Sequence, residues 1–259
     1  MLQMQIKEKE KERKTEERDE GKIGFWLLPS DIELFSFEEA EKLGCSDIIL
    51  PIENLTKTAD FVTKCHERNI RAHAWINCLR YRDRWYNPDD VMATTRAQQL
   101  IRRAFELNFD GIFLDDLRYP KKISEAAKSY QKINRMALEL NSVIKAVNPN
   151  ALTIIGVMPA MNEAYKVYGQ CSPCLAAYAD IQVPLTFTDE KAADPSFVER
   201  VTRWVVKKSA KPVWAGLTAF EDKEEIVPAS QTQLKRLIKA AEKGGASKAL
   251  IYHYGVSLL

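Results

Sequence analysis

The sequence has no long hydrophobic run and no strong excess of charge of either sign. None of its apolar stretches approaches the roughly 18–20 residues needed to cross a membrane. The amino-terminal stretch MLQMQIKEKEKERKTEERDEGK contains no apolar segment of signal-peptide length. The formal net charge is +2, which favours neither nucleic acid nor a membrane surface as a partner. We therefore expect a cytoplasmic protein, although the sequence leaves open the export of a longer precursor.

Cysteine and histidine are scarce, which bears on metal and redox chemistry. The chain has five cysteines and three histidines. Cys171 and Cys174 form a single C-x-x-C pair, whereas a structural zinc site requires four ligands and the histidines are scattered along the chain. A sparse, odd-numbered set of cysteines is typical of a reducing compartment. We expect no bound metal, and we interpret Cys171 and Cys174 as ordinary loop or helix cysteines.

Glycine accounts for only ten residues, and the phosphate-binding motifs that depend on it are missing. Neither a G-x-G-x-x-G motif nor a P-loop follows any of the apolar segments. The sequence therefore gives no reason to expect a nucleotide cofactor, and we expect the protein to work without cofactors.

Residues 1–20 are mostly Lys, Glu, Arg, Asp and Gln, with few apolar side chains among them. Such a segment cannot bury apolar surface. We expect it to be a charged tail, helical or disordered, outside a single domain formed by residues 21–259. The whole chain of 259 residues is 46% hydrophobic, which is ample for one large core.

Eight short apolar runs, rich in β-branched and aromatic residues, follow one another from Gly21 onward. They lie within KIGFWLLP, DIILPI, IRAHAWINCL, DGIFLDD, LTIIGVMPA, ADIQVPLTF, PVWAGLTAF and KALIYHYGV. Most are continuously apolar rather than alternating, as in parallel strands that are covered on both faces. Amphipathic segments separate them, such as SFEEAEKLG, with a serine before the helix and a glycine after it. The pattern predicts a single (β/α)8 TIM barrel, with a doubly wound sheet as the alternative.

Two adjacent carboxylates follow the fourth predicted strand, at the edge where a barrel builds its active site. Within FDGIFLDDLRYP, the strand ends in Asp115 and Asp116, and Arg118 and Tyr119 come next. A charge at the end of an apolar strand is costly unless it is paired or used. Because side chains alternate along a strand, we expect Asp115 to face the barrel mouth and Asp116 to point away and hold its neighbours.

Carboxylates and aromatic rings also follow the other predicted strands, and this favours carbohydrate as the ligand. Apolar faces meet sugar C–H surfaces, and cleavage requires one carboxyl as acid and another as nucleophile or base. We predict that Asp115 is the nucleophile or base and that Glu221 is the acid, ahead of Glu163 and Glu190. The predicted substrate-binding residues are Asp116, Arg118, Tyr119, Trp75, Asn77, Trp214, Tyr252 and His253. The basic and aromatic loop at residues 80–86 is either a solvated rim or a site for anionic sugars.

Several of these segments resemble glycosyl-hydrolase-like TIM barrels. FDGIFLDDLRYP is similar to the DGIHLDYIRYP signature of that family. Four further stretches resemble the family in the same order, namely AHAWINCLR with YNPDD, YGQCSPCLAAYADIQVPLTFT, PVWAGLTAFED and KALIYHYG. By this resemblance, Asp115 matches the aspartate of the fourth strand, and Arg118 and Tyr119 match an Arg-Tyr pair. The adjacent Asp116 is more distantly similar to the FLDN of polygalactosaminidase-like barrels.

The same stretch departs from the D-G-x-D-x-D-x-E pattern of family-18 chitinases. Asp110 and Asp115 match that pattern, but Phe113 stands where it has an aspartate and Leu117 where it has the catalytic glutamate. This argues against chitinase-type substrate-assisted chemistry. PLTF also replaces the PMLY of the glycosyl-hydrolase-like relatives, which removes a tyrosine from the end of the sixth strand.

The sequence therefore predicts a glycoside hydrolase that acts on an oligo- or polysaccharide. The alternative is a carbohydrate-binding or scaffold barrel without catalysis. A metal-dependent hydrolase is a weaker hypothesis, because the rim has neither an H-x-H motif nor a tight histidine-carboxylate cluster. An enzyme requires a second carboxyl across the mouth from Asp115, whereas a binding module does not.

Overall fold

Eight parallel strands form one sheet in the computed structural model, which describes residues 21–52, 54–124, 128–222 and 227–252. The strands are β1 (Ile23–Trp26), β2 (Cys45–Pro51), β3 (Arg71–Asn77), β6 (Gly111–Asp115), β7 (Leu152–Val157), β8 (Ile181–Pro184), β9 (Trp214–Thr218) and β12 (Lys248–Tyr252). Seven of them lie within a predicted segment, and β2 begins two residues before the predicted DIILPI. The predicted charged tail, residues 1–20, lies outside the described residues.

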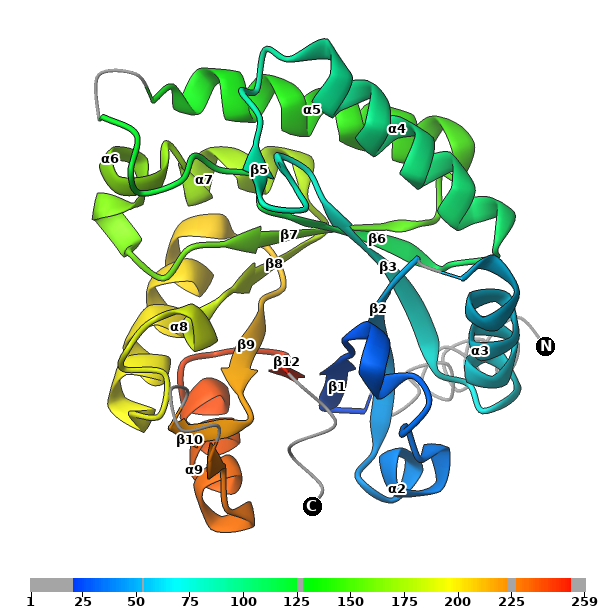
Figure 1. Cartoon of the computed structure of the whole chain (residues 1–259). Helices are drawn as coiled ribbons and strands as arrows, with labels where there is room; N and C mark the ends of the chain where they lie inside the picture. Colours follow the sequence, from blue (N-terminus) through cyan, green and yellow to red (C-terminus); the bar gives the residue numbers. More distant parts are fainter. Residues whose placement is uncertain (1–20, 53, 125–127, 223–226, 253–259) are drawn as a thin grey trace, which may run out of the picture.

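The sheet closes into a barrel (Figure 1). Its strand order is β8-β7-β6-β3-β2-β1-β12-β9. The first and last strands in this order are β8 and β9. They meet through isolated parallel bridges, Gln182 with Val213 and Leu185 with Gly216. The predicted (β/α)8 TIM barrel is thus confirmed, and the doubly wound alternative is wrong.

Helices surround the barrel on the outside (Figure 1). They are α2 (Phe37–Lys42), α3 (Leu55–Glu67), α4 (Val91–Glu106), α5 (Tyr130–Val147), α6 (Ala164–Tyr168), α7 (Ser172–Leu175), α8 (Pro195–Ser209) and α9 (Gln231–Lys243). The predicted boundaries of α2 are confirmed: Ser36 Oγ accepts a hydrogen bond from the Glu39 N–H at 3.3 Å, and Gly44 follows the helix with φ +71°. Among the described residues, no helix is long and apolar enough to cross a membrane.

Two layers of apolar side chains hold the barrel together. The larger layer lies between the sheet and the helices and includes Ile48, Ile112 and Leu140. The other fills the barrel interior and includes Trp26, Phe113, Trp214 and further residues of the strands. Every strand is covered on both faces, so buried and exposed residues do not alternate along it. All five residues of β6, for example, are buried.

Two short antiparallel hairpins extend from the carboxyl ends of strands. After β3 come β4 (Arg80–Tyr81) and β5 (Arg84–Trp85), and after β9 come β10 (Phe220–Asp222) and β11 (Val227–Pro228). These hairpins place additional side chains at the end of the barrel where loops build active sites.

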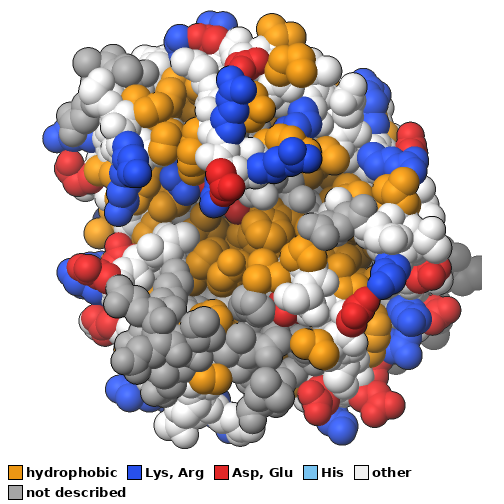
Figure 2. Space-filling view, in the orientation of Figure 1, with side chains coloured by type: hydrophobic (Ala, Val, Ile, Leu, Met, Phe, Trp, Pro, Cys, Tyr) orange, Lys and Arg blue, Asp and Glu red, His pale blue; other side chains and the backbone are white. Residues whose placement is uncertain are grey.

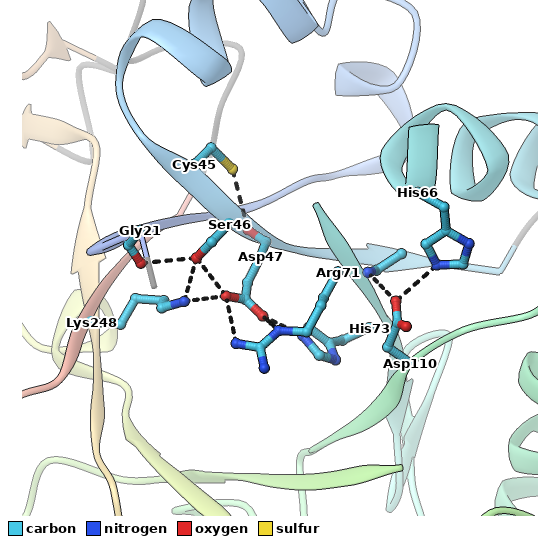
Figure 3. Close-up of polar contacts among 10 residues, drawn as sticks. Gly21, Cys45, Ser46, Asp47, His66, Arg71, His73, Asp110 and Lys248 are labelled. Atoms are coloured by element: carbon cyan, nitrogen blue, oxygen red, sulfur yellow. Dashed lines mark hydrogen bonds and ion pairs between the residues drawn. The ribbon is translucent and has the colours of Figure 1, made fainter. Parts of the chain in front are cut away.

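A buried carboxylate joins three strands near the opposite, amino-terminal end of the barrel (Figure 3). Asp47 of β2 is fully buried. Its Oδ1 lies 2.8 Å from His73 Nε2 and accepts a hydrogen bond from Arg71 Nε, also at 2.8 Å, both from β3. Lys248 of β12 donates to Asp47 Oδ2 and to the Oγ of Ser46, and its ammonium lies over a ring of the interior layer.

These partners determine the ionisation of Asp47. Burial alone would raise the pKa of its carboxyl, but the hydrogen bonds from His73 and Arg71 and the charges of His73 and Lys248 hold that pKa well below its usual value. The ionised carboxylate therefore links β2 to β3 on one side and to β12 on the other. Because Lys248 is itself buried, the two charges depend on each other.

We predict that Asp47→Asn destabilises the protein by roughly 3 kcal/mol, because it leaves the Lys248 ammonium buried without a counter-charge. Chemical denaturation measures the change in the free energy of unfolding. The control is Glu33→Gln, which removes an exposed ion pair with Lys57 and should leave the midpoint unchanged. The double variant Asp47→Asn/Lys248→Met should recover part of the loss. Equal denaturation midpoints for the wild type and Asp47→Asn would contradict this account.

Candidate active site

A cavity of about 410 Å³ opens at the carboxyl-terminal end of the barrel. It is lined by Trp26, Trp75, Asn77, Arg80, Arg82, Asp115, Asp116, Arg118, Met158, Leu185, Phe187, Thr188 and Tyr252. Figure 2 shows apolar side chains in the hollow at the centre of this face, with charged side chains along its upper edge. Six of the predicted site residues therefore share one cavity: Asp115, Asp116, Arg118, Trp75, Asn77 and Tyr252.

Asp115 is the last residue of β6 and is only 8% exposed. Its Oδ2 accepts a hydrogen bond from Trp75 Nε1 at 3.0 Å, and its Oδ1 accepts one from the backbone N–H of Asp116 at 2.7 Å. Burial, together with the neighbouring charge of Asp116, raises the pKa of Asp115 to about 7. The two hydrogen bonds and the charge of Arg118 oppose that rise without cancelling it.

Asp116 also lines the cavity, which corrects the expectation that it points away from the mouth. The alternation argument was wrong here because the strand ends at Asp115, and Asp116 has a left-handed backbone with φ +47°. Its Oδ1 lies 3.0 Å from Arg118 Nη2. Burial raises the pKa of Asp116 above its ordinary value, and the charges of Arg118 and Arg80 and the hydrogen bond from Arg118 oppose that rise without cancelling it. Unlike Asp115, Asp116 thus has a close cationic partner.

Aromatic rings of the first, third and last barrel strands pack together in the cavity wall. The ring of Trp26 meets that of Trp75 edge to face, with centroids 5.0 Å apart, and that of Tyr252 at 5.3 Å. Phe187 stacks on Tyr252, with centroids 4.2 Å apart and planes inclined by 12°. Burial is the main reason that the pKa of Tyr252 is raised, and the charge of Asp115 adds to it. These rings therefore form an apolar part of the cavity wall beside the charged residues.

Two predicted substrate-binding residues lie away from the cavity. Trp214 is the first residue of β9, and its ring faces His73 and Lys248 in the buried interior, near the amino-terminal end of the barrel. Tyr119 is 2% exposed and packs in the layer between sheet and helices. Neither side chain lines the cavity, so the structure lends no support to a sugar contact at either position.

Two further predictions concern residues that the structure does not describe in full. Glu221, the predicted acid, belongs to β10, but its side chain lies outside the described part of the chain. His253 directly follows β12 and also lies outside the described residues. Both remain predictions. The fallback acids Glu163 and Glu190 are exposed and do not line the cavity.

Cys171 and Cys174 form a disulfide in the structure, with Cα atoms 5.2 Å apart. This corrects their interpretation as ordinary cysteines: C-x-x-C spacing around a helix start brings two thiols close enough to bond. Cys45, Cys65 and Cys78 are free and buried. Within the part of the chain that the structure describes, no group of three or more His, Cys, Asp or Glu side chains is arranged to hold a metal ion.

Seven cavity-lining residues were not among the predicted site residues: Trp26, Arg80, Arg82, Met158, Leu185, Phe187 and Thr188. Trp26 ends the first predicted strand, and Phe187 follows the sixth, so the strand-end rule could have included both. The two arginines belong to the basic loop, whose role the sequence left open. The structure shows that this loop forms the β4–β5 hairpin and that its two arginines line the cavity.

The sequence matches no family model and no curated protein. The fold, however, is similar to solved structures of carbohydrate-active enzymes. A class V chitinase from Pseudomonas fluorescens Pf-5 superposes with a TM-score of 0.63 at 13% identity, over 90% of this chain and 95% of that one. For the endo-1,4-beta-mannanase from Rhizomucor miehei the TM-score is 0.62 at 10% identity, over 86% and 82% of the two chains. The GH53 catalytic domain from Ignisphaera aggregans gives 0.62 at 14%, over 92% and 87%. At such low identity, this similarity establishes a shared TIM-barrel fold.

The raised pKa of Asp115 predicts a pH-dependent stability. The folded protein holds this proton up to about pH 7, whereas the unfolded chain releases it near pH 4, so ionising Asp115 removes stability as the pH rises between these values. We expect the melting temperature of the wild type to fall from pH 5 to pH 8 by about 3 °C or more beyond the fall in Asp115→Asn. Calorimetry of both proteins across this range measures the difference. Asp47 does not interfere, because its lowered pKa acts at more acidic pH. Parallel curves would show that Asp115 ionises normally.

Proposed function

We propose that the protein is a glycoside hydrolase that acts on an oligo- or polysaccharide, with Asp115 as the carboxyl that exchanges a proton with the glycosidic oxygen. One observation carries this proposal: a buried carboxyl with a pKa raised to about 7 lies in a cavity with aromatic walls at the active-site end of a TIM barrel. The fold shared with carbohydrate-active enzymes supports it at the level of architecture alone.

The environment of Asp115 suits a proton donor. A catalytic acid must hold its proton near neutral pH and release it to the leaving group, and this requires a pKa close to the working pH. Burial keeps the proton on Asp115, while the N–H groups of Trp75 and Asp116 stabilise the carboxylate that remains after transfer. We therefore assign Asp115 the role of acid, in place of the nucleophile or base that the sequence favoured.

A second carboxylate is needed to attack the sugar or to activate water. Asp116 is the candidate among the described residues, because it lines the same cavity and its ion pair with Arg118 opposes the rise that burial causes in its pKa. Glu221 is the other candidate, since β10 directly follows the Thr218 end of β9. Carboxyl groups about 5–5.5 Å apart give retention of configuration, and separations of about 6.5–9.5 Å give inversion. The product anomer therefore indicates how far apart the two acting carboxyls lie.

The cavity matches a sugar in size and lining. Its volume of about 410 Å³ falls within the range of roughly 300–1,000 Å³ that is usual for small-ligand pockets. Trp75 and Tyr252 offer apolar surface for the C–H faces of a pyranose, and the amide of Asn77 offers hydrogen bonds for hydroxyls. These contacts would orient the glycosidic oxygen toward Asp115.

A carbohydrate-binding barrel without catalysis is the second candidate. The observation in its favour is that the two carboxylates that the structure places in the cavity are neighbours on one strand end rather than facing each other across the mouth. Such a protein would bind the same sugars and leave them intact.

Hydrolysis of a panel of oligosaccharides tests the proposal. Asp115→Asn should lower kcat by about 10²–10⁴-fold, because the leaving group then departs unprotonated. Glu190→Gln, an exposed acid of the same rim outside the cavity, is the matched control and should keep wild-type rates. Of Asp116→Asn and Glu221→Gln, the variant with the larger loss identifies the second carboxylate. Equal cleavage by wild type and Asp115→Asn would refute the assignment, and sugar binding without any cleavage would favour the binding barrel.

A further inference from the structure

Three arginines line one side of the cavity, and two of them come from the β4–β5 hairpin. Arg80 belongs to β4, and Arg82 lies in the two-residue connection to β5 with φ +53°. Figure 2 shows basic side chains along the edge of the central apolar hollow, over the position of β5 in Figure 1. The hairpin therefore gives the cavity a basic wall.

The protein holds this hairpin in a defined position. Arg96 of α4 donates hydrogen bonds to the backbone carbonyls of Asn77, Cys78 and Arg80 at the base of the hairpin. The guanidinium of Arg96 also lies 4.9 Å from the centre of the Tyr81 ring. These contacts fix the connection between β3 and the hairpin. They therefore keep the orientation of the two hairpin arginines constant.

The three arginines differ in their partners. Arg118 pairs with Asp116 and lies over the ring of Trp85, 4.6 Å from its centre. The guanidinium groups of Arg80 and Arg82, by contrast, have no ion-pair or hydrogen-bond partner within the described residues. Arg80 lies close enough for its charge to act on Asp116 and on Tyr252.

Among the side chains that the structure describes, the cavity lining consequently has an excess of positive charge. Three guanidinium groups line it together with two carboxyls, and Asp116 is already paired with Arg118. Asp115 holds its proton at neutral pH part of the time, so its charge offsets the remaining two arginines only in part. A neutral sugar would leave both guanidinium groups without a charged partner, whereas an anionic group would form charge-assisted hydrogen bonds with them.

We propose that the substrate is an anionic glycan, in which the carboxylate or sulfate of one sugar binds Arg80 and Arg82 while the ring lies against the aromatic wall. This inference rests on the proposed function and names the substrate class of the same site. The shared chemistry is a compact oxyanion on a sugar, and guanidinium groups bind both carboxylate and sulfate oxygens.

Binding of monosaccharides tests this inference without any cleavage, because these probes contain no glycosidic bond. We expect glucuronate and galacturonate to bind about tenfold more tightly than glucose and galactose by calorimetric titration at low salt, and this preference to shrink at high salt. Glucose 6-sulfate distinguishes a sulfate from a carboxylate as the preferred group. If it binds as tightly as the uronates, the site accepts any compact oxyanion. If it binds more weakly than the uronates, the site prefers a carboxylate.

The variant Arg80→Gln/Arg82→Gln should abolish the preference for charged sugars, so that the uronates bind no more tightly than glucose and galactose. Arg84→Gln is the matched control, because Arg84 belongs to the same hairpin but lies over Tyr86, outside the cavity lining, and should keep the full preference. Equal affinity for charged and neutral sugars, binding of neither, or a preference that survives in the double variant would overturn the inference.

The two proposals fail in different ways. If charged sugars bind through the two arginines but no glycan is cleaved, the hydrolase assignment fails and the anionic ligand stands. If only neutral glycans are cleaved and bound, the hydrolase assignment stands and the anionic substrate is wrong.

Discussion

Two buried carboxylates at opposite ends of the barrel follow the same physical rule and reach opposite ionisation states. Burial disfavours the charge of both Asp47 and Asp115. Asp47 is surrounded by Arg71, His73 and Lys248, so it stays ionised and ties three strands together. Asp115 accepts hydrogen bonds from neutral N–H groups and has another carboxyl beside it, so its pKa rises to about 7. The difference between the two carboxyls therefore lies in their neighbours: close cations keep Asp47 ionised, whereas Asp115 has a raised pKa that suits proton transfer.

The fold could be predicted from the sequence because the patterns that indicate its strands and helices are local. Strands of a closed parallel barrel are covered on both faces and therefore read as continuous apolar runs, and all eight were found. The serine and glycine around α2 likewise act within one helical turn. The rule that active-site residues follow the strand ends predicted Asp115, Trp75, Asn77, Arg118 and Tyr252 for one site, and all five line the same cavity.

The remaining errors arise where a side chain's direction depends on three-dimensional context. Asp116 enters the cavity through a left-handed backbone that no alternation rule anticipates. Trp214 starts its strand rather than ending it, so its ring lies deep in the barrel, and the start of β9 is a boundary that sequence fixes poorly. Arg80 and Arg82 reach the cavity because a hairpin turns them there. The disulfide depends on the distance between Cys171 and Cys174, which spacing alone does not decide.

A TIM barrel supports many chemistries, so the function of this chain depends on its cavity rather than on its fold. Our account depends most on one claim, that Asp115 keeps its proton near neutral pH. Titration of the side-chain carboxyl by ¹³C nuclear magnetic resonance, with the signal assigned by its loss in Asp115→Asn, measures this directly. We predict a midpoint near pH 7. A midpoint near 4, the ordinary value for an aspartate, would contradict the account.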